Sequence, residues 1–171
     1  MSTAEKPLGL IAGGGELPRV VAQAAKAAGR EIYVVALLGS VVEDWTNAFP
    51  HQFFSPGEPG RIIKAFKDHG VEEVLLCGRV DRPKFNDMKL DAKGMLLLPK
   101  AIAAAREGDD ALLRFIVGIC EDAGMTAISV AQAAPALVAQ EGVLGKVAPQ
   151  PEHQADIEKA FAIVHALGAL C

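Results

Sequence analysis

One short stretch near the N-terminus constrains the fold more than any other part of this sequence. Residues 8–12 form an apolar run that predicts a buried strand, and glycines occupy positions 13–15. A helical pattern follows, with Pro18 near its start, where the missing N–H of proline would be unpaired anyway. A strand that turns through glycines into a helix presents N–H groups and a positive dipole end to an anion. The stretch therefore predicts a phosphate-binding loop in an α/β protein.

Apolar runs and helical patterns alternate along the following part of the chain. This alternation predicts an α/β fold with a Rossmann-like, doubly wound, mostly parallel five-stranded sheet and helices on both faces. The strand order that we expect is 3-2-1-4-5. Hydrophobic residues make up 51% of the 171 residues, which is enough for a large core. The expected strands are residues 8–12, 31–38, 51–55, 73–77 and 125–130, and the expected helices are residues 17–28, 61–69, 92–106 and 109–122.

The pattern changes after residue 130, and it predicts two parts. Residues 1–130 are expected to form the Rossmann-like ligand-binding domain, and residues 131–171 a linker and the first helix of a second domain. Glycines and prolines mark residues 141–154 as the linker, and residues 152–170 have apolar positions at helical spacing. A single helix cannot form a core. It is expected to dock on the first domain, to pair with another chain or to belong to a second domain.

Composition excludes several classes of function. The net charge of −4 and the presence of one Trp and one Tyr argue against nucleic acid as a partner. No apolar run approaches the roughly 18 residues that span a bilayer. The N-terminus shows no signal-peptide pattern, and the three cysteines are widely spaced. These features predict a cytoplasmic protein in a reducing compartment.

The glycine loop has a structural and a functional interpretation. Any α/β protein needs tight strand-to-helix turns, but three glycines in a row exceed that need, which favours a ligand. Pro18 stands in the place of the third glycine of a dinucleotide motif, and residues 36–40 contain no acid for a ribose. No P-loop is present, because Val147 follows Lys146. A phosphate-bearing ligand other than NAD or ATP is therefore expected. Its candidate contacts are Gly13, Gly14, Gly15, Glu16 and Leu17.

Two further loops carry charges that a ligand could use. Arg79 and Arg82 follow the strand expected next to the first one, and guanidinium groups bind phosphate well. An exposed charged loop explains them equally well. Asp109 and Asp110 follow Gly108, where Asp109 is expected to cap a helix and Asp110 to favour its positive end. Because a capping residue can also touch a ligand, both remain candidate substrate contacts.

The residues alone do not give a complete catalytic set. The four histidines have no metal-ligand spacing, and no nucleophile elbow is present. Cys77 is expected to be a small buried hydrophobic residue rather than a nucleophile. Catalytic residues and metal ligands are therefore left unassigned.

Four motifs in order make the sequence similar to a known family. They are LGLIAGGGELP at residues 8–18, CGRVDRP at 77–83, GDDALLR at 108–114 and GKVAPQPEHQAD at 145–156. The sequence resembles the UDP-2,3-diacylglucosamine pyrophosphatase family of the alphaproteobacterial type, which has no metallophosphoesterase motif. The resemblance covers nearly the whole chain.

The resemblance implies a hydrolase of lipid A biosynthesis. It would cleave the pyrophosphate bond of UDP-2,3-diacylglucosamine to UMP and 2,3-diacylglucosamine 1-phosphate, with Mg²⁺ or Mn²⁺. The family places its ligand between two domains and its essential acid in the second, so this chain is expected to be the N-terminal part and inactive alone. The lipid substrate suggests a peripheral contact with the inner face of the inner membrane, and a homodimer is left open.

Two other functions are weighed beside this one. The first is a non-catalytic nucleotide-binding module that docks on a partner through its terminal helix. The second is an NAD-dependent oxidoreductase domain, which Pro18 and the missing ribose acid oppose. Release of UMP by the full-length protein would separate the hydrolase from both.

Overall fold

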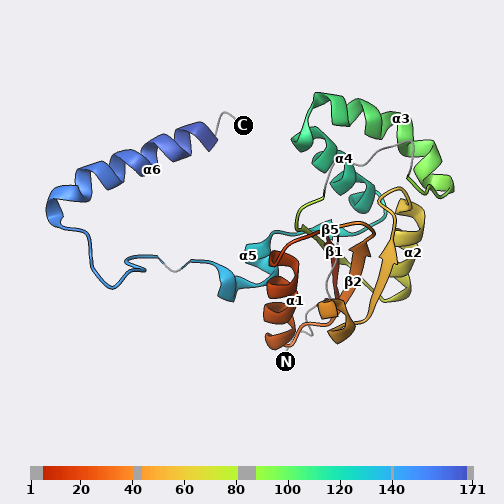
Figure 1. Ribbon diagram of the computed structural model, residues 1–171, viewed down its shortest axis with the longest axis horizontal. Helices are drawn as coiled ribbons and strands as arrows, with labels where there is room; N and C mark the ends of the chain where they lie inside the picture. The colour runs from red at the N-terminus through yellow and green to blue at the C-terminus, as the bar shows by residue number, and fades with distance from the viewer. Residues whose placement is uncertain (1–5, 41–43, 81–87, 140, 169–171) are drawn as a thin grey trace. The chain divides into compact units, whose positions relative to one another are not determined.

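The protein divides into two compact units, Met1–Val138 and Ala139–Cys171 (Figure 1). This computed structural model describes residues 6–40, 44–80, 88–139 and 141–168. The predicted second domain begins at residue 131, whereas residues 131–138 pack with the first unit. Whether the second unit belongs to a further domain stays a prediction.

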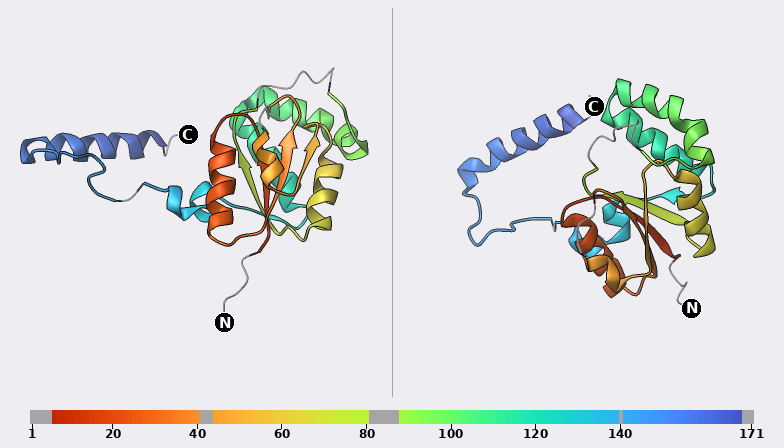
Figure 2. Two further views of the ribbon diagram at one scale, coloured as in Figure 1. Left: turned by 60° about the horizontal axis from the view of Figure 1, so that its bottom comes forward. Right: turned by 45° about the vertical axis from the view of Figure 1, so that its right-hand side comes forward.

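A five-stranded parallel sheet forms the centre of the first unit (Figures 1 and 2). Its order is β3-β2-β1-β4-β5, so the predicted fold and strand order are confirmed. Strands that are distant in sequence, such as β1 and β4, pair directly. Parallel neighbours need a crossover connection, which is usually helical. The strands are β1 (Leu8–Ala12), β2 (Ile32–Leu37), β3 (His51–Phe54), β4 (Glu73–Cys77) and β5 (Thr126–Ala127).

The central strand β1 is buried along its whole length, as an apolar run predicts for a sheet covered on both faces. Side chains alternate across a strand, so Leu10 joins one core cluster and Ile11 the other. Gly9 allows Phe66 to approach, because a Cβ at Gly9 would lie 2.7 Å from Cε1 of that ring.

Helices cover both faces of this sheet. α1 (Leu17–Ala27) and α5 (Val130–Ala133) contribute to the first core cluster, while α2 (Pro59–Asp68) and α4 (Asp109–Glu121) contribute to the second. α3 (Ala92–Glu107) packs on α4 and α2 (Figure 1). The described residues of this unit also form the 3-10 helices η1 (Asp44–Ala48) and η3 (Pro135–Leu137).

The fifth strand is much shorter than the sequence predicts. Residues 125–130 were expected to form it, but only Thr126–Ala127 pair with β4. Ser129 starts α5 instead, because its hydroxyl accepts a hydrogen bond from the N–H of Gln132 and the Gln132 side chain accepts one from the N–H of Ser129. This capping box ends the strand. Ala133 and Ala134 then bury themselves in the first core cluster.

The second unit consists of η4 (Pro151–His153) followed by α6 (Gln154–Gly168). The predicted helix at residues 152–170 is therefore present with slightly shorter bounds. Its apolar side chains are exposed, including Phe161 at 63% and Val164 at 66%. In the part of the chain that the structure describes, no helix combines the length and the apolar character needed to cross a membrane.

Candidate functional site

The glycine loop is hydrogen-bonded to the end of β4. The N–H of Gly13 donates to the carbonyl of Cys77 at 2.8 Å, and the N–H of Gly14 donates to that of Arg79 at 2.7 Å. The N–H of Arg79 donates back to the carbonyl of Gly14 at 2.8 Å, which makes a short antiparallel bridge. The prediction that Gly13 and Gly14 offer N–H groups to a ligand is therefore corrected, because both donors already have protein acceptors.

Backbone geometry accounts for each of the three glycines. A Cβ at Gly13 would lie 2.6 Å from the carbonyl oxygen of Arg79, and one at Gly14 would lie 2.7 Å from that of Ser40. Gly15 has a φ of 94°, a region that other residues rarely adopt. The glycines are thus explained by the way the loop packs between β2 and β4.

The donors that face solvent lie one step later, at the start of α1. Gly15, Glu16 and Leu17 are exposed, and among the described residues none of their N–H groups has a protein acceptor. Glu16 is the N-cap residue without a side-chain cap, and its carboxylate pairs with Arg19. The N-terminus of a helix at the carboxyl edge of a parallel sheet favours an anion. The anion-binding prediction therefore moves from residues 13–15 to residues 15–17.

Pro18 has a structural reason to replace the third glycine of a dinucleotide motif. It is buried and packs against Gly78, where a Cβ would lie 2.7 Å from Cγ of the proline ring. Gly78 also has a φ of 97°. The two residues fix the start of α1 against the end of β4.

An apolar groove of about 510 Å³ lies beside this loop, between the carboxyl ends of the strands and helices α2, α3 and α4. Most of its lining side chains are aliphatic, and Asp109 is the one charged residue among the described residues that line it. The sequence interpretation did not identify this groove, because its walls come from segments far apart in the chain. Side chains that line it include Leu37, Ile62, Leu76, Leu98, Ile116 and Ile119.

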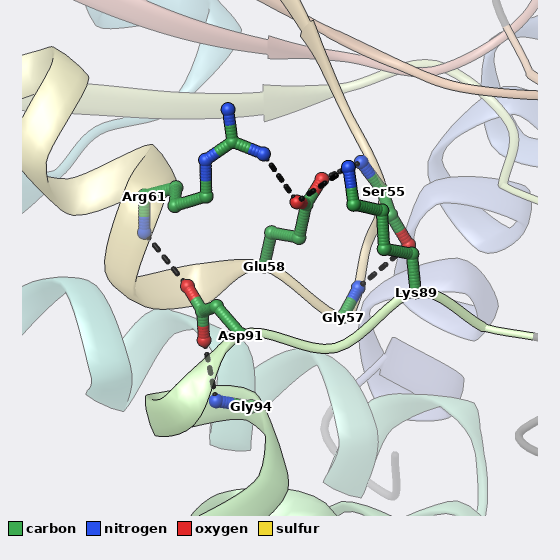
Figure 3. A network of polar contacts seen from close by, with 7 residues as sticks. All are labelled: Ser55, Gly57, Glu58, Arg61, Lys89, Asp91 and Gly94. Carbon is green, nitrogen blue, oxygen red and sulfur yellow. Dashed lines mark hydrogen bonds and ion pairs between the residues drawn. The ribbon is translucent and has the colours of Figure 1, made fainter.

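A buried carboxylate lies between two residues that line the groove, Gly57 and Pro59, and belongs to a network of polar contacts (Figure 3). Glu58 is 2% exposed, accepts a hydrogen bond from the N–H of Ser55 at 2.9 Å and pairs with Arg61 at 2.5 Å. Lys89 approaches the same carboxylate at 3.5 Å. Burial raises the pKa of Glu58, but the Ser55 N–H and the two cations outweigh it and hold the pKa below its usual value. Glu58 thus ties the β3–α2 turn to residues before α3.

Asp91 joins the starts of two helices (Figure 3). Its carboxylate accepts from the N–H of Arg61 in α2 at 2.8 Å and from the N–H of Gly94 in α3 at 2.6 Å. The contact is tight, since a Cβ at Gly94 would lie 2.0 Å from the carbonyl oxygen of Gly57. The aspartate directly before an apolar helix could have indicated the cap on α3, but the bond from Asp91 to α2 depends on tertiary packing.

The predicted cap at Asp109 is wrong. Gly108 occupies the N-cap position of α4 with a φ of 133°, and Asp109 is the first helical residue. The sharp turn after α3 needs the left-handed backbone that glycine supplies. Asp110 pairs with Arg114 at 2.6 Å, as expected for residues four apart, while Asp109 lines the groove.

The two predicted arginines have different outcomes. Arg79 is brought to the glycine loop by the backbone bridge, and it is exposed. Arg82 lies outside the described residues. Ligand contacts at these positions, and at Asp109 and Asp110, stay predictions.

The cysteines behave as buried apolar residues. Cys77 and Cys120 both line the groove, and burial raises the pKa of each thiol. For Cys120 the pKa rises to about 11. Neither thiol is a reactive thiolate near neutral pH.

The described residues contain no ready-made cluster of metal ligands. Across residues 6–40, 44–80, 88–139 and 141–168, no group of three or more His, Cys, Asp or Glu side chains could hold a metal ion. A requirement for Mg²⁺ or Mn²⁺ therefore stays a prediction.

This chain is similar to known proteins over two different lengths of its sequence. The UDP-2,3-diacylglucosamine pyrophosphatase LpxI of Caulobacter vibrioides is 40% identical over 165 residues, which cover 96% of this chain and 59% of that protein. This chain therefore spans less than two thirds of the relative. A 2-dehydro-3-deoxyphosphooctonate aldolase of Yersinia enterocolitica is 31% identical over 70 residues, which cover 41% of this chain and 23% of that enzyme.

The family assignment rests on a match that covers most of the chain. The sequence model described as the LpxI N-terminal domain matches residues 7–137, which include the whole sheet, the glycine loop and the groove. The resemblance that the four motifs indicated is thereby confirmed. The chain belongs to the LpxI N-terminal domain family.

Proposed function

We propose that this chain is the ligand-binding part of a UDP-2,3-diacylglucosamine pyrophosphatase. The reaction would hydrolyse the pyrophosphate bond to give UMP and 2,3-diacylglucosamine 1-phosphate, as a step of lipid A biosynthesis. The observation that carries the proposal is the 40% identity over 96% of the chain to the LpxI protein of Caulobacter vibrioides. A cytoplasmic location and a divalent cation belong to the same proposal.

The geometry supports a ligand with one charged and one apolar end. The solvent-facing N–H groups of Gly15, Glu16 and Leu17 suit a phosphate, since a helix N-terminus carries partial positive charge. Arg79 lies beside them and would offset further negative charge. The groove of about 510 Å³ begins next to this loop at Gly78, and its aliphatic walls suit a hydrocarbon chain.

A hydrolysis experiment tests the reaction. The full-length protein that contains this chain is incubated with UDP-2,3-diacylglucosamine and Mg²⁺ or Mn²⁺, and UMP is measured. Release of UMP supports the proposal. If substrate remains intact with either cation, the hydrolase is excluded and the nucleotide-binding module is the better interpretation.

A pair of substitutions tests the groove. Ala101 lines it on α3, so Ala101→Trp fills part of its volume. We expect kcat/KM for the long-chain substrate to fall about tenfold or more, since displaced acyl burial is worth about 0.8 kcal/mol for each CH₂. Ala27→Trp makes the same change at an exposed position near the end of α1 and should leave kcat/KM unchanged. Equal activity of the two variants would remove the acyl chain from this groove.

A further inference from the structure

Helix α3 has apolar side chains on two opposite faces. Its inner face contributes Leu97, Leu98 and Ala101 to the groove. The residues that face solvent form a second apolar stripe, which we call the outer stripe: Ala92, Met95, Leu96, Pro99 and Ala103. Their spacing of three or four residues, with Met95 and Leu96 adjacent, keeps them on one side of the helix.

The outer stripe is unusually exposed for its composition. Met95 is 65% exposed and Leu96 is 78% exposed. α3 packs on α4 and α2 and lies at the periphery of the first unit (Figure 1). A helix that is apolar all round is normally buried, so this stripe indicates a surface that is covered in use.

The charges on α3 indicate what covers the stripe. The charged side chains of α3 are the basic Lys93, Lys100 and Arg106 and one acidic residue, Glu107, at its last position. In the described part of the chain, no ion pair involves Lys100 or Arg106. The whole chain carries a net charge of −4, so this basic strip is a local feature. Basic residues flanking exposed apolar side chains are typical of helices that lie on anionic lipid.

We propose that the outer stripe of α3 binds the surface of an anionic lipid membrane. The apolar side chains would enter the boundary between headgroups and acyl chains, while Lys100 and Arg106 contact lipid phosphates. A second copy of this chain fits less well, because a two-fold contact would bring two sets of like charges together. The inference rests on the proposed function only for the presence of a lipid substrate in the membrane, and the groove that would bind this substrate lies on the face of α3 opposite the outer stripe.

Vesicle binding tests this surface without any hydrolysis. The chain is sedimented with vesicles of equal parts phosphatidylglycerol and phosphatidylcholine, and with vesicles of phosphatidylcholine alone. We expect binding to the anionic vesicles that weakens with added salt. Leu96→Glu should weaken binding at least about tenfold, and Lys100→Gln about fivefold. Leu144→Glu changes an equally exposed leucine, 71% exposed, outside α3 and should leave binding unchanged.

Several outcomes would overturn the proposal. These are no sedimentation of the unmodified chain with anionic vesicles, equal binding to both vesicle types, or equal loss in the Leu96→Glu and Leu144→Glu variants. A dimer in sedimentation equilibrium that Leu96→Glu dissociates would assign the stripe to a second copy instead. Both variant sites are exposed, so circular dichroism should show unchanged folding. A full-length protein that binds vesicles through α3 but releases no UMP would contradict only the proposed hydrolase.

Discussion

Gly94 and Gly118 offer a direct test of the contact that holds α3 to the sheet unit. Both are glycines within helices, at the start of α3 and near the end of α4. A Cβ at Gly94 would lie 2.0 Å from the carbonyl oxygen of Gly57, whereas a Cβ at Gly118 would meet nothing within 4 Å. The same change to alanine should therefore have opposite effects at the two positions.

The magnitudes follow from this geometry. Carbon and oxygen atoms normally stay about 3.3 Å apart or more, so Gly94→Ala must move α3 or the Gly57 turn by about 1.3 Å. The turn has little freedom, because a Cβ at Gly57 would itself lie 2.5 Å from the carbonyl oxygen of Lys89. Overpacking costs about 1–3 kcal/mol, and the better helix propensity of alanine returns about 1 kcal/mol. With two backbones in conflict, we expect a net loss of about 1–2 kcal/mol in the free energy of unfolding.

In the control substitution, only the better helix propensity of alanine acts, because no neighbour is crowded. Gly118→Ala should raise the free energy of unfolding by about 0.5–1 kcal/mol. Urea unfolding followed by far-UV circular dichroism measures both variants against the unmodified chain. If Gly94→Ala proves as stable as the unmodified chain, or if both variants shift in the same direction, the close contact between α3 and the Gly57 turn is refuted.

Three further predictions concern the groove and its supports. Folding lowers the pKa of Glu58, so the stability that its carboxylate contributes is present above about pH 4.3 and is lost as pH falls through the folded pKa. The free energy of unfolding of Glu58→Gln should therefore differ most from that of the unmodified chain near pH 7, as unfolding titrations would show. Asp91→Ala should cost about 1–2 kcal/mol by thermal unfolding, because two helix N-termini lose their acceptor, while Asp68→Ala at an exposed pair should cost under about 0.5 kcal/mol. The Cys120 thiol, whose pKa is about 11, should react with a thiol reagent at pH 8 far more slowly in the folded chain than in urea, as peptide mass spectrometry would show.

The fold could be predicted because local signals agreed along the chain. The apolar run at β1, the glycines after it and Pro18 in α1 each favoured the same strand-turn-helix unit. Regular alternation of strands and helices then left few arrangements of a parallel sheet, and the predicted order matched. The end of β5 was predicted wrongly because the apolar run continues past the capping box at Ser129, where hydrogen bonding rather than hydrophobicity sets the boundary.

The site could be predicted only in its position. Its location at the carboxyl edge beside β1 followed from topology. The sequence did not reveal that the N–H groups of Gly13 and Gly14 bond within the protein, because their acceptors lie at the end of β4, far along the chain. Glu58 was missed for a similar reason: a glutamate between prolines and glycines is typical of an exposed turn, and its burial depends on Arg61 and on residues before α3.

The bridge between Gly14 and Arg79 has a consequence for how the site moves. Each residue donates its amide hydrogen to the other, so an opening that separates the two segments exposes both amides to solvent deuterium. The two amides should therefore share one opening rate, although they stand on different loops. An anion bound at the start of α1 would slow that rate at Arg79 as well as at Gly14. The exchange of a single amide on the β4 side thus reports occupancy of a site formed by the other loop.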